Sequence, residues 1–101
     1  MRILKTQDVL LVSEVEQLDA AHSEAFQSAV AAALAPAVKS IDIDLSQTGF
    51  IDCGGVGALV ALRKRAKGCN ADATLCLRNV GQPVRRLLRL THADEMFTLV
   101  A

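Results

Sequence analysis

The sequence predicts one α/β domain in which a mixed sheet of four or five strands is covered by helices on one face. Short segments with alternating apolar residues recur between longer segments whose apolar residues follow the helical period, a pattern typical of layered α/β domains. The chain has 101 residues, of which 51% are hydrophobic, and this suits a single core. No internal repeat, low-complexity segment or linker divides it, so residues 1–101 are assigned to one domain.

The first third of the chain is expected to form a hairpin followed by a helix. Residues 2–6 and 9–12 lie on either side of a short polar turn, which predicts two paired strands. Asp19 is a candidate N-cap for a helix that continues to about Leu34 and ends before Pro36. The helical period places these residues on its apolar face: Phe26, Val30, Ala33, Leu34 and Ala37.

A strand and a second helix are expected next. Residues 41–45 alternate apolar with acidic side chains, which predicts a strand with one apolar face. A helix is predicted from about Gly54 to Lys67, where Gly68 is expected to stop it. The positions expected inside the fold from this helix are Val56, Leu59, Val60 and Leu62.

The last third is expected to add one strand and one main helix. Residues 73–77 predict a strand parallel to residues 41–45, because a helix connects the two. Pro83 suits the first turn of a helix that begins near Gln82. Residues 94–97 are expected to form a short closing turn of helix. In the main helix the inward residues are predicted to be Val84, Leu87 and Leu88.

Composition and charge exclude several classes of function. No apolar segment approaches the ~18–20 residues of a membrane span, so no membrane insertion is expected. Three cysteines without CxxC spacing predict reduced thiols in a cytoplasmic protein, and neither metal nor cofactor is expected. Residues 1–58 have three basic and eight acidic side chains, whereas residues 59–101 have eight basic and three acidic ones. With three aromatic residues in the chain, the basic groups are interpreted as solvated helix faces, and no direct nucleic-acid binding is predicted.

The most informative segment is Asp52-Cys53-Gly54-Gly55, at the junction of a polar loop and the second helix. A helix N-terminus presents unpaired backbone N–H groups and the positive end of the helix dipole. Such a place can hold a phosphate, accept a phosphoryl group or dock a partner. No P-loop lysine accompanies the glycines, so nucleotide hydrolysis is not predicted, and the glycines are interpreted as serving the turn and close packing.

The chain resembles the STAS domain family over about residues 8–98. The resemblance rests on Asp44-Leu45-Ser46, on Phe50 through Leu59, and on the basic end of the second helix. The later segments 84–90 and 94–97 resemble the C-terminal helical pattern of the family. The resemblance implies a mixed sheet with helices on one face. It also implies an anti-sigma factor antagonist that binds an anti-sigma factor of the serine-kinase type and so frees a sigma factor for transcription.

The family motif is commonly Asp-Ser-[Ser/Thr]-Gly, with the first serine phosphorylated by the anti-sigma kinase. Asp52 and Gly55 match this motif, whereas Cys53 occupies the phosphoacceptor position and Gly54 replaces the second hydroxyl residue. A serine kinase transfers its phosphoryl group to a hydroxyl, and a thiol does not normally replace one. The substitution therefore predicts that phosphorylation, which would add about −2 charge beside Asp52, does not switch this protein off.

Three interpretations of Cys53 are considered. It is a small residue in an unswitched binding module, or a redox switch whose thiol forms a sulfenic acid or a mixed disulfide. In the third, the domain serves a transport ATPase, because STAS subunits of lipid-transport ABC systems have Asp-Thr-Gly-Gly-type sequences. An enzymatic use of Cys53 is the remaining alternative, and no catalytic residue is predicted.

The predicted partner-binding surface comprises the loop before the second helix and the outward side of that helix. Ser46 and Thr48 are also the fallback phosphoacceptors, although a turn-stabilising role is preferred for both. Homodimerisation is compatible with the sequence. The residues of the predicted surface are Ser46, Thr48, Asp52, Cys53, Gly54, Gly55, Gly57, Ala58 and Ala61.

Overall fold

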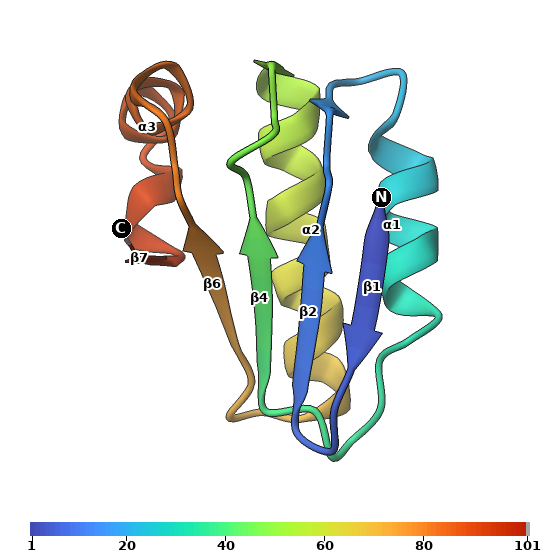
Figure 1. The fold of residues 1–101 in the computed structure, drawn as a ribbon. Coiled ribbons are helices and arrows are strands. Elements are labelled where there is room, and N and C mark those ends of the chain that lie inside the picture. Colours follow the sequence, from blue (N-terminus) through green and yellow to red (C-terminus); the bar gives the residue numbers. More distant parts are fainter. Residues whose placement is uncertain (101) are drawn as a thin grey trace.

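A computed structural model, which describes residues 1–100, contains a five-stranded sheet in the order β1-β2-β4-β6-β7 (Figure 1). Strands β1 and β2 form an antiparallel hairpin, and every other neighbouring pair in this sheet is parallel. The strands comprise Arg2–Lys5 (β1), Val9–Ser13 (β2), Ser40–Asp44 (β4), Thr74–Arg78 (β6) and Thr98–Val100 (β7).

Two helices lie on one face of this sheet and leave the other face uncovered (Figure 1). They are α1, Ser23–Ala31, and α2, Cys53–Cys69. A third helix, α3, spans Gln82–Leu90 and lies beyond β6, followed by the short 3-10 helix η1 at Ala93–Glu95. The fold class predicted from the sequence, a mixed sheet of four or five strands with helices on one face, is confirmed, and the sheet has five strands.

The core lies between the sheet and the helices. The three inner strands β2, β4 and β6 alternate, so that one side of each is buried and the other faces outward. On the outward face, Asp42 accepts hydrogen bonds from the Arg78 guanidinium at 3.1 and 3.2 Å. The buried strand residues are Leu10, Val12, Ile41, Ile43, Leu75 and Leu77.

A second, two-stranded sheet was not predicted. Strand β3, Gln17–Leu18, pairs in parallel with β5, Phe50–Ile51, which directly precedes α2. Each strand is two residues long, too short for an alternating pattern to be recognised. The pairing fixes the loop before α2 against the segment before α1.

The boundaries of the first helix correct the sequence prediction. Helix α1 begins at Ser23, and Asp19 does not cap it; instead the Asp19 carboxylate accepts a hydrogen bond from the His22 backbone N–H at 3.0 Å. The helix ends at Ala31 rather than near Leu34. Ala37, expected on its apolar face, lies outside the helix and is exposed.

The end of α2 also differs from the prediction. Gly68 lies inside the helix, which continues through Cys69. Asn70 follows the helix with an extended backbone, and its side-chain oxygen accepts a hydrogen bond from the Asp72 N–H at 3.0 Å. Within residues 1–100, no helix is both long enough and apolar enough to cross a membrane.

Candidate partner-binding site at the start of helix α2

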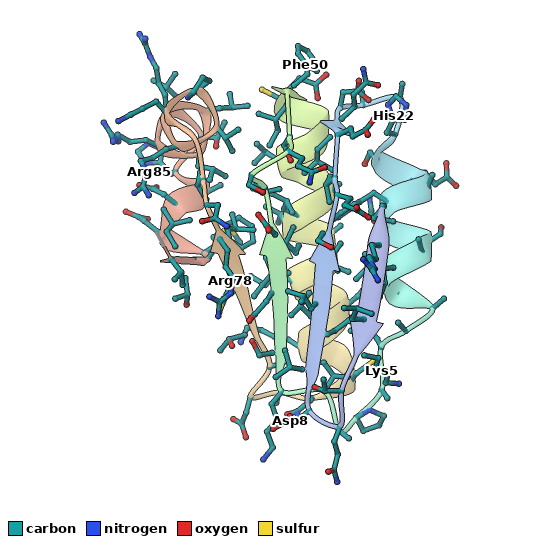
Figure 2. All side chains as sticks on the ribbon, viewed as in Figure 1. Lys5, Asp8, His22, Phe50, Arg78 and Arg85 are labelled. Atoms are coloured by element: carbon teal, nitrogen blue, oxygen red, sulfur yellow. The ribbon has the colours of Figure 1, made fainter. Side chains whose placement is uncertain are left out.

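The candidate site lies at the end of the molecule where β2 and β4 finish and where α1 and α2 begin (Figure 1). Ligand and partner sites of α/β folds commonly lie at the carboxyl ends of parallel strands. The helix N-termini there direct unpaired N–H groups toward solvent. Figure 2 places Phe50, just before α2, and His22, just before α1, at this same end.

Cys53 is the first residue of α2 and its side chain is exposed. Asp52 is the N-cap: it has an extended backbone, and its Oδ1 accepts a hydrogen bond from the Gly55 N–H at 3.0 Å. This arrangement satisfies one of the unpaired N–H groups of the helix. It leaves the Cys53 side chain free to meet a partner.

The loop before α2 is held by hydrogen bonds to the segment that follows β2. The Thr48 hydroxyl donates to the Val15 carbonyl at 2.6 Å, and the Gly49 N–H donates to the Glu16 carbonyl at 3.0 Å. Beyond the β3–β5 pair, the Ala20 N–H lies 3.4 Å from Asp52 Oδ2. The loop before α2 and the segment after β2 therefore hold each other in place, and together they fix the position of Cys53.

Gly54 and Gly55 allow the first turn of α2 to approach this segment. A Cβ atom at Gly54 would lie 2.6 Å from the Ala20 Cα, and one at Gly55 would lie 1.8 Å from the Leu18 carbonyl oxygen. Both distances are below any real Cβ contact, so neither position accepts a side chain without movement of the backbone. These contacts support close packing as the role of the two glycines.

Asp44 orders the other end of the same loop. Its Oδ1 accepts hydrogen bonds from the Ser46 N–H at 2.9 Å and from Asn79 Nδ2 at 3.2 Å. These bonds, chiefly the one from the Ser46 backbone, hold the pKa of Asp44 below its ordinary value. Asn79 adopts a left-handed backbone conformation with φ of 55°, which asparagine tolerates better than most residues.

The residues predicted to form the partner-binding surface have different exposures. Ser46, Cys53 and Gly57 are exposed, while Thr48, Asp52, Gly54 and Ala61 are half-buried.

Two members of the predicted surface are buried. Ala58 has no exposed surface, so the prediction that it lies on the outward side of α2 is wrong. Gly55 is also buried, against the Leu18 carbonyl. A partner can therefore touch the outward side of α2 at Gly57 and Ala61, but not at Ala58 or Gly55.

Phe50 is a surface residue that lies outside the predicted partner-binding residues. Its side chain is 53% exposed, beside the start of α2. It lines a shallow pocket of about 230 Å³ between the loop and the start of α3, together with Ser46 and Pro83. The sequence did contain a signal for this residue, because Phe50 is one of three aromatic residues in the chain and lies in a mainly polar loop.

The chemistry of this site suits binding. Within residues 1–100, no group of three or more His, Cys, Asp or Glu side chains is placed to hold a metal ion. What the site offers is an exposed thiol, an exposed phenyl ring and the small residues of α2. Small residues allow a partner to approach closely.

A family model of the STAS domain matches residues 1–101. The chain belongs to the STAS domain family. Similar folds occur in TM1081 from Thermotoga maritima (20% identity, 99% of this chain and 85% of that chain, TM-score 0.85). They also occur in an anti-sigma factor antagonist from Mycobacterium paratuberculosis (24% identity, 98% and 82%, TM-score 0.82). A third is the phosphorylated Bacillus cell fate determinant SpoIIAA (15% identity, 99% and 90%, TM-score 0.71).

Proposed function

We propose that this STAS domain is a non-enzymatic binding module that acts as an anti-sigma factor antagonist. Its partner is an anti-sigma factor of the ATP-binding serine-kinase type, and binding frees a sigma factor for transcription. The observation that supports this most directly is the exposed Cys53 side chain at the start of α2, at the position that resembles the family's phosphoacceptor. The anti-sigma factor antagonists of similar fold support the general role.

The binding surface is proposed to consist of the loop at Ser46, the residues around Cys53, and the outward positions Gly57 and Ala61 of α2. Phe50 adds an apolar contact next to Cys53. Asp52 and Thr48 act by holding the loop rather than by touching the partner, because their side chains are engaged in hydrogen bonds.

The proposal is tested by reconstitution with the serine-kinase-type anti-sigma factors and sigma factors of the same genome. Each anti-sigma factor is bound to its fluorescently labelled sigma factor, and this protein is added. Release of sigma, measured as a fall in fluorescence anisotropy, is expected with one of them. The same titration with Phe50→Ala is expected to need more protein, and Leu90→Ala, also highly exposed but on α3, serves as the control.

If no anti-sigma factor releases its sigma factor, the proposed function is wrong. A transport ATPase of the same genome that binds through Cys53 and Phe50 would then replace the anti-sigma factor as the partner. Binding to such an ATPase is measured by titration calorimetry with Phe50→Ala and its control Leu90→Ala.

A further inference from the structure

A surface groove lies between α1 and the segment that joins β2 to β3. Its volume is about 500 Å³. Its base is apolar and includes the buried side chains of Val15 and Phe26, with Ala25 and Ala29 of α1 beside them. None of the residues at this groove belongs to the surface around Cys53 described above.

The rim of the groove is acidic. Glu14 and Glu16 both line it and are exposed, and among residues 1–100 neither forms an ion pair. His22 also lines the groove, but its Nδ1 lies 2.6 Å from Asp19 Oδ1, so its ring is paired with a carboxylate. Met1 also lines the groove, and its amino group opposes one of the two glutamate charges. The remaining negative charge favours a cationic occupant over phosphate or an acidic peptide.

The backbone holds Glu14 in place at this rim. Its φ of 57° lies in the left-handed region, which is uncommon for a residue other than glycine, asparagine or aspartate. Such a conformation costs free energy and persists where the surrounding structure fixes it. At Glu14 this conformation turns the chain after β2, so that the Glu14 side chain is exposed and that of the next residue, Val15, is buried.

One segment of the chain connects the groove to the surface around Cys53. Segment 17–22 runs from the groove rim to the start of α2, because Gln17 pairs with Phe50 and the Ala20 N–H lies near the Asp52 carboxylate. His22, on the rim, and Phe50 lie at the same end of the molecule (Figure 2). A single partner seated on Cys53 can therefore reach the groove.

We propose that this groove docks a basic segment of the partner that binds at Cys53. The segment presents an arginine or lysine to Glu14 and Glu16 and inserts a neighbouring apolar side chain over Phe26. The identity of the partner rests on the function proposed above. The basic and apolar character of the docking segment is inferred from the residues of the groove. Charges on a rim mainly affect the association rate and its salt dependence, and the apolar contact affects dissociation.

Two groove variants and one control separate these effects. Glu14→Gly with Glu16→Gln removes both carboxylates, and glycine accepts the left-handed backbone at position 14. Ala25→Phe fills the groove from the exposed side of α1. Glu95→Gln removes an exposed glutamate of η1, outside the groove.

Association with the serine-kinase-type anti-sigma factor is measured at low and high salt. The double variant is expected to bind about tenfold more weakly through slower association, with a smaller salt dependence. Ala25→Phe is expected to dissociate faster with the salt dependence unchanged, and Glu95→Gln to bind within about twofold of the native protein. If both groove variants bind like the native protein while Cys53→Asp does not bind, the groove proposal is wrong and the proposed function stands.

A second measurement tests the groove if no anti-sigma factor binds. Isotope-labelled protein is titrated with an acetylated Leu-Arg-Leu-Arg peptide and with its Leu-Glu-Leu-Glu counterpart. Shift changes at the amides of Ala25, Phe26 and Ala29 with the basic peptide alone would support the groove, and their absence would overturn it.

The remaining alternative occupant of the groove is a second copy of this chain. Its helix α3 has arginines beside Leu90, a residue that is 70% exposed. If light scattering shows self-association, and both Leu90→Asp and the double variant abolish it, then a second copy of this chain occupies the groove. That result would overturn the proposal.

Discussion

The Leu18 carbonyl oxygen fills the space in which a side chain at Gly55 would begin. A Cβ atom at Gly55 would lie 1.8 Å from that oxygen, so the first turn of α2 and strand β3 are in direct backbone contact. This contact, with the Asp52 cap, sets where Cys53 emerges from the surface.

Gly55→Ala is therefore expected to destabilise the fold. The methyl group must displace a backbone carbonyl, and overpacking of this kind costs about 1–3 kcal/mol or more. Gly57→Ala is the matched control, because nothing lies within 4 Å of its Cβ position and alanine is the better helix former. Urea unfolding should give a lower midpoint for Gly55→Ala and an unchanged or higher one for Gly57→Ala. Equal midpoints would show that β3 does not pack on α2 as described.

The Asp52 cap predicts a difference between two substitutions at one position. Asp52→Ala removes the acceptor for the Gly55 N–H and should lower the free energy of unfolding by about 1 kcal/mol. Asp52→Asn keeps one side-chain oxygen for the Gly55 N–H and gives up only the longer 3.4 Å contact with the Ala20 N–H, so it should lose much less. Denaturant titrations at pH 7 measure both. A loss in Asp52→Asn as large as in Asp52→Ala would indicate that the charge, rather than the cap, is what matters.

Asp44 predicts a pH dependence of stability. Its pKa in the folded protein is lower than the ordinary value of 3.8, chiefly because the Ser46 N–H donates to it. The ionised carboxylate therefore stabilises the fold above about pH 4, and this stabilisation is lost as pH falls through the lowered pKa. Asp44→Asn should be less stable than the native protein by about 0.5–1 kcal/mol at pH 7. The difference should shrink as pH falls below the ordinary value of 3.8 and through the lowered pKa of Asp44, and one that stays constant with pH would contradict the assignment.

The replacement of serine by cysteine predicts the outcome of a phosphorylation assay. The native protein and Cys53→Ser are each incubated with the anti-sigma kinase and radiolabelled ATP. Label is expected on Cys53→Ser alone, because its hydroxyl stands where the native protein has a thiol. Label on Ser46 or Thr48 of the native protein would contradict the absence of a phosphorylation switch. Thr48 is the less accessible of the two, since it is half-buried and its hydroxyl donates to the Val15 carbonyl.

Much of the fold follows from local sequence patterns. The alternation of Ile41 and Ile43 with Asp42 predicts the central strand, and Asp52 before a helical segment predicts the start of α2 within one residue. The short strands β3, β5 and β7 could not be predicted, because two or three residues show no period and their pairing depends on distant segments.

The errors at the site have two causes. Helix α2 has glycine or alanine on both its buried and exposed sides, so hydrophobicity alone does not distinguish Ala58 from Ala61. The helical period does contain a signal for Ala58, which lies four residues before the buried Leu62 and so on the same side of α2. The packing of β3 against α2 at Gly55, in contrast, depends on segments far apart in the sequence. The same limitation hid the groove, whose walls come from residues 14–17 and from α1.

The most direct test is the affinity of the anti-sigma factor for two variants of the same helix. Cys53→Asp places a carboxylate at the proposed contact, and Cys69→Asp places one at the other exposed cysteine, at the far end of α2. Titration calorimetry should show binding weakened by about tenfold or more for Cys53→Asp and unchanged for Cys69→Asp. Equal affinity of both variants and the native protein would contradict the claim that the start of α2 is where the partner binds.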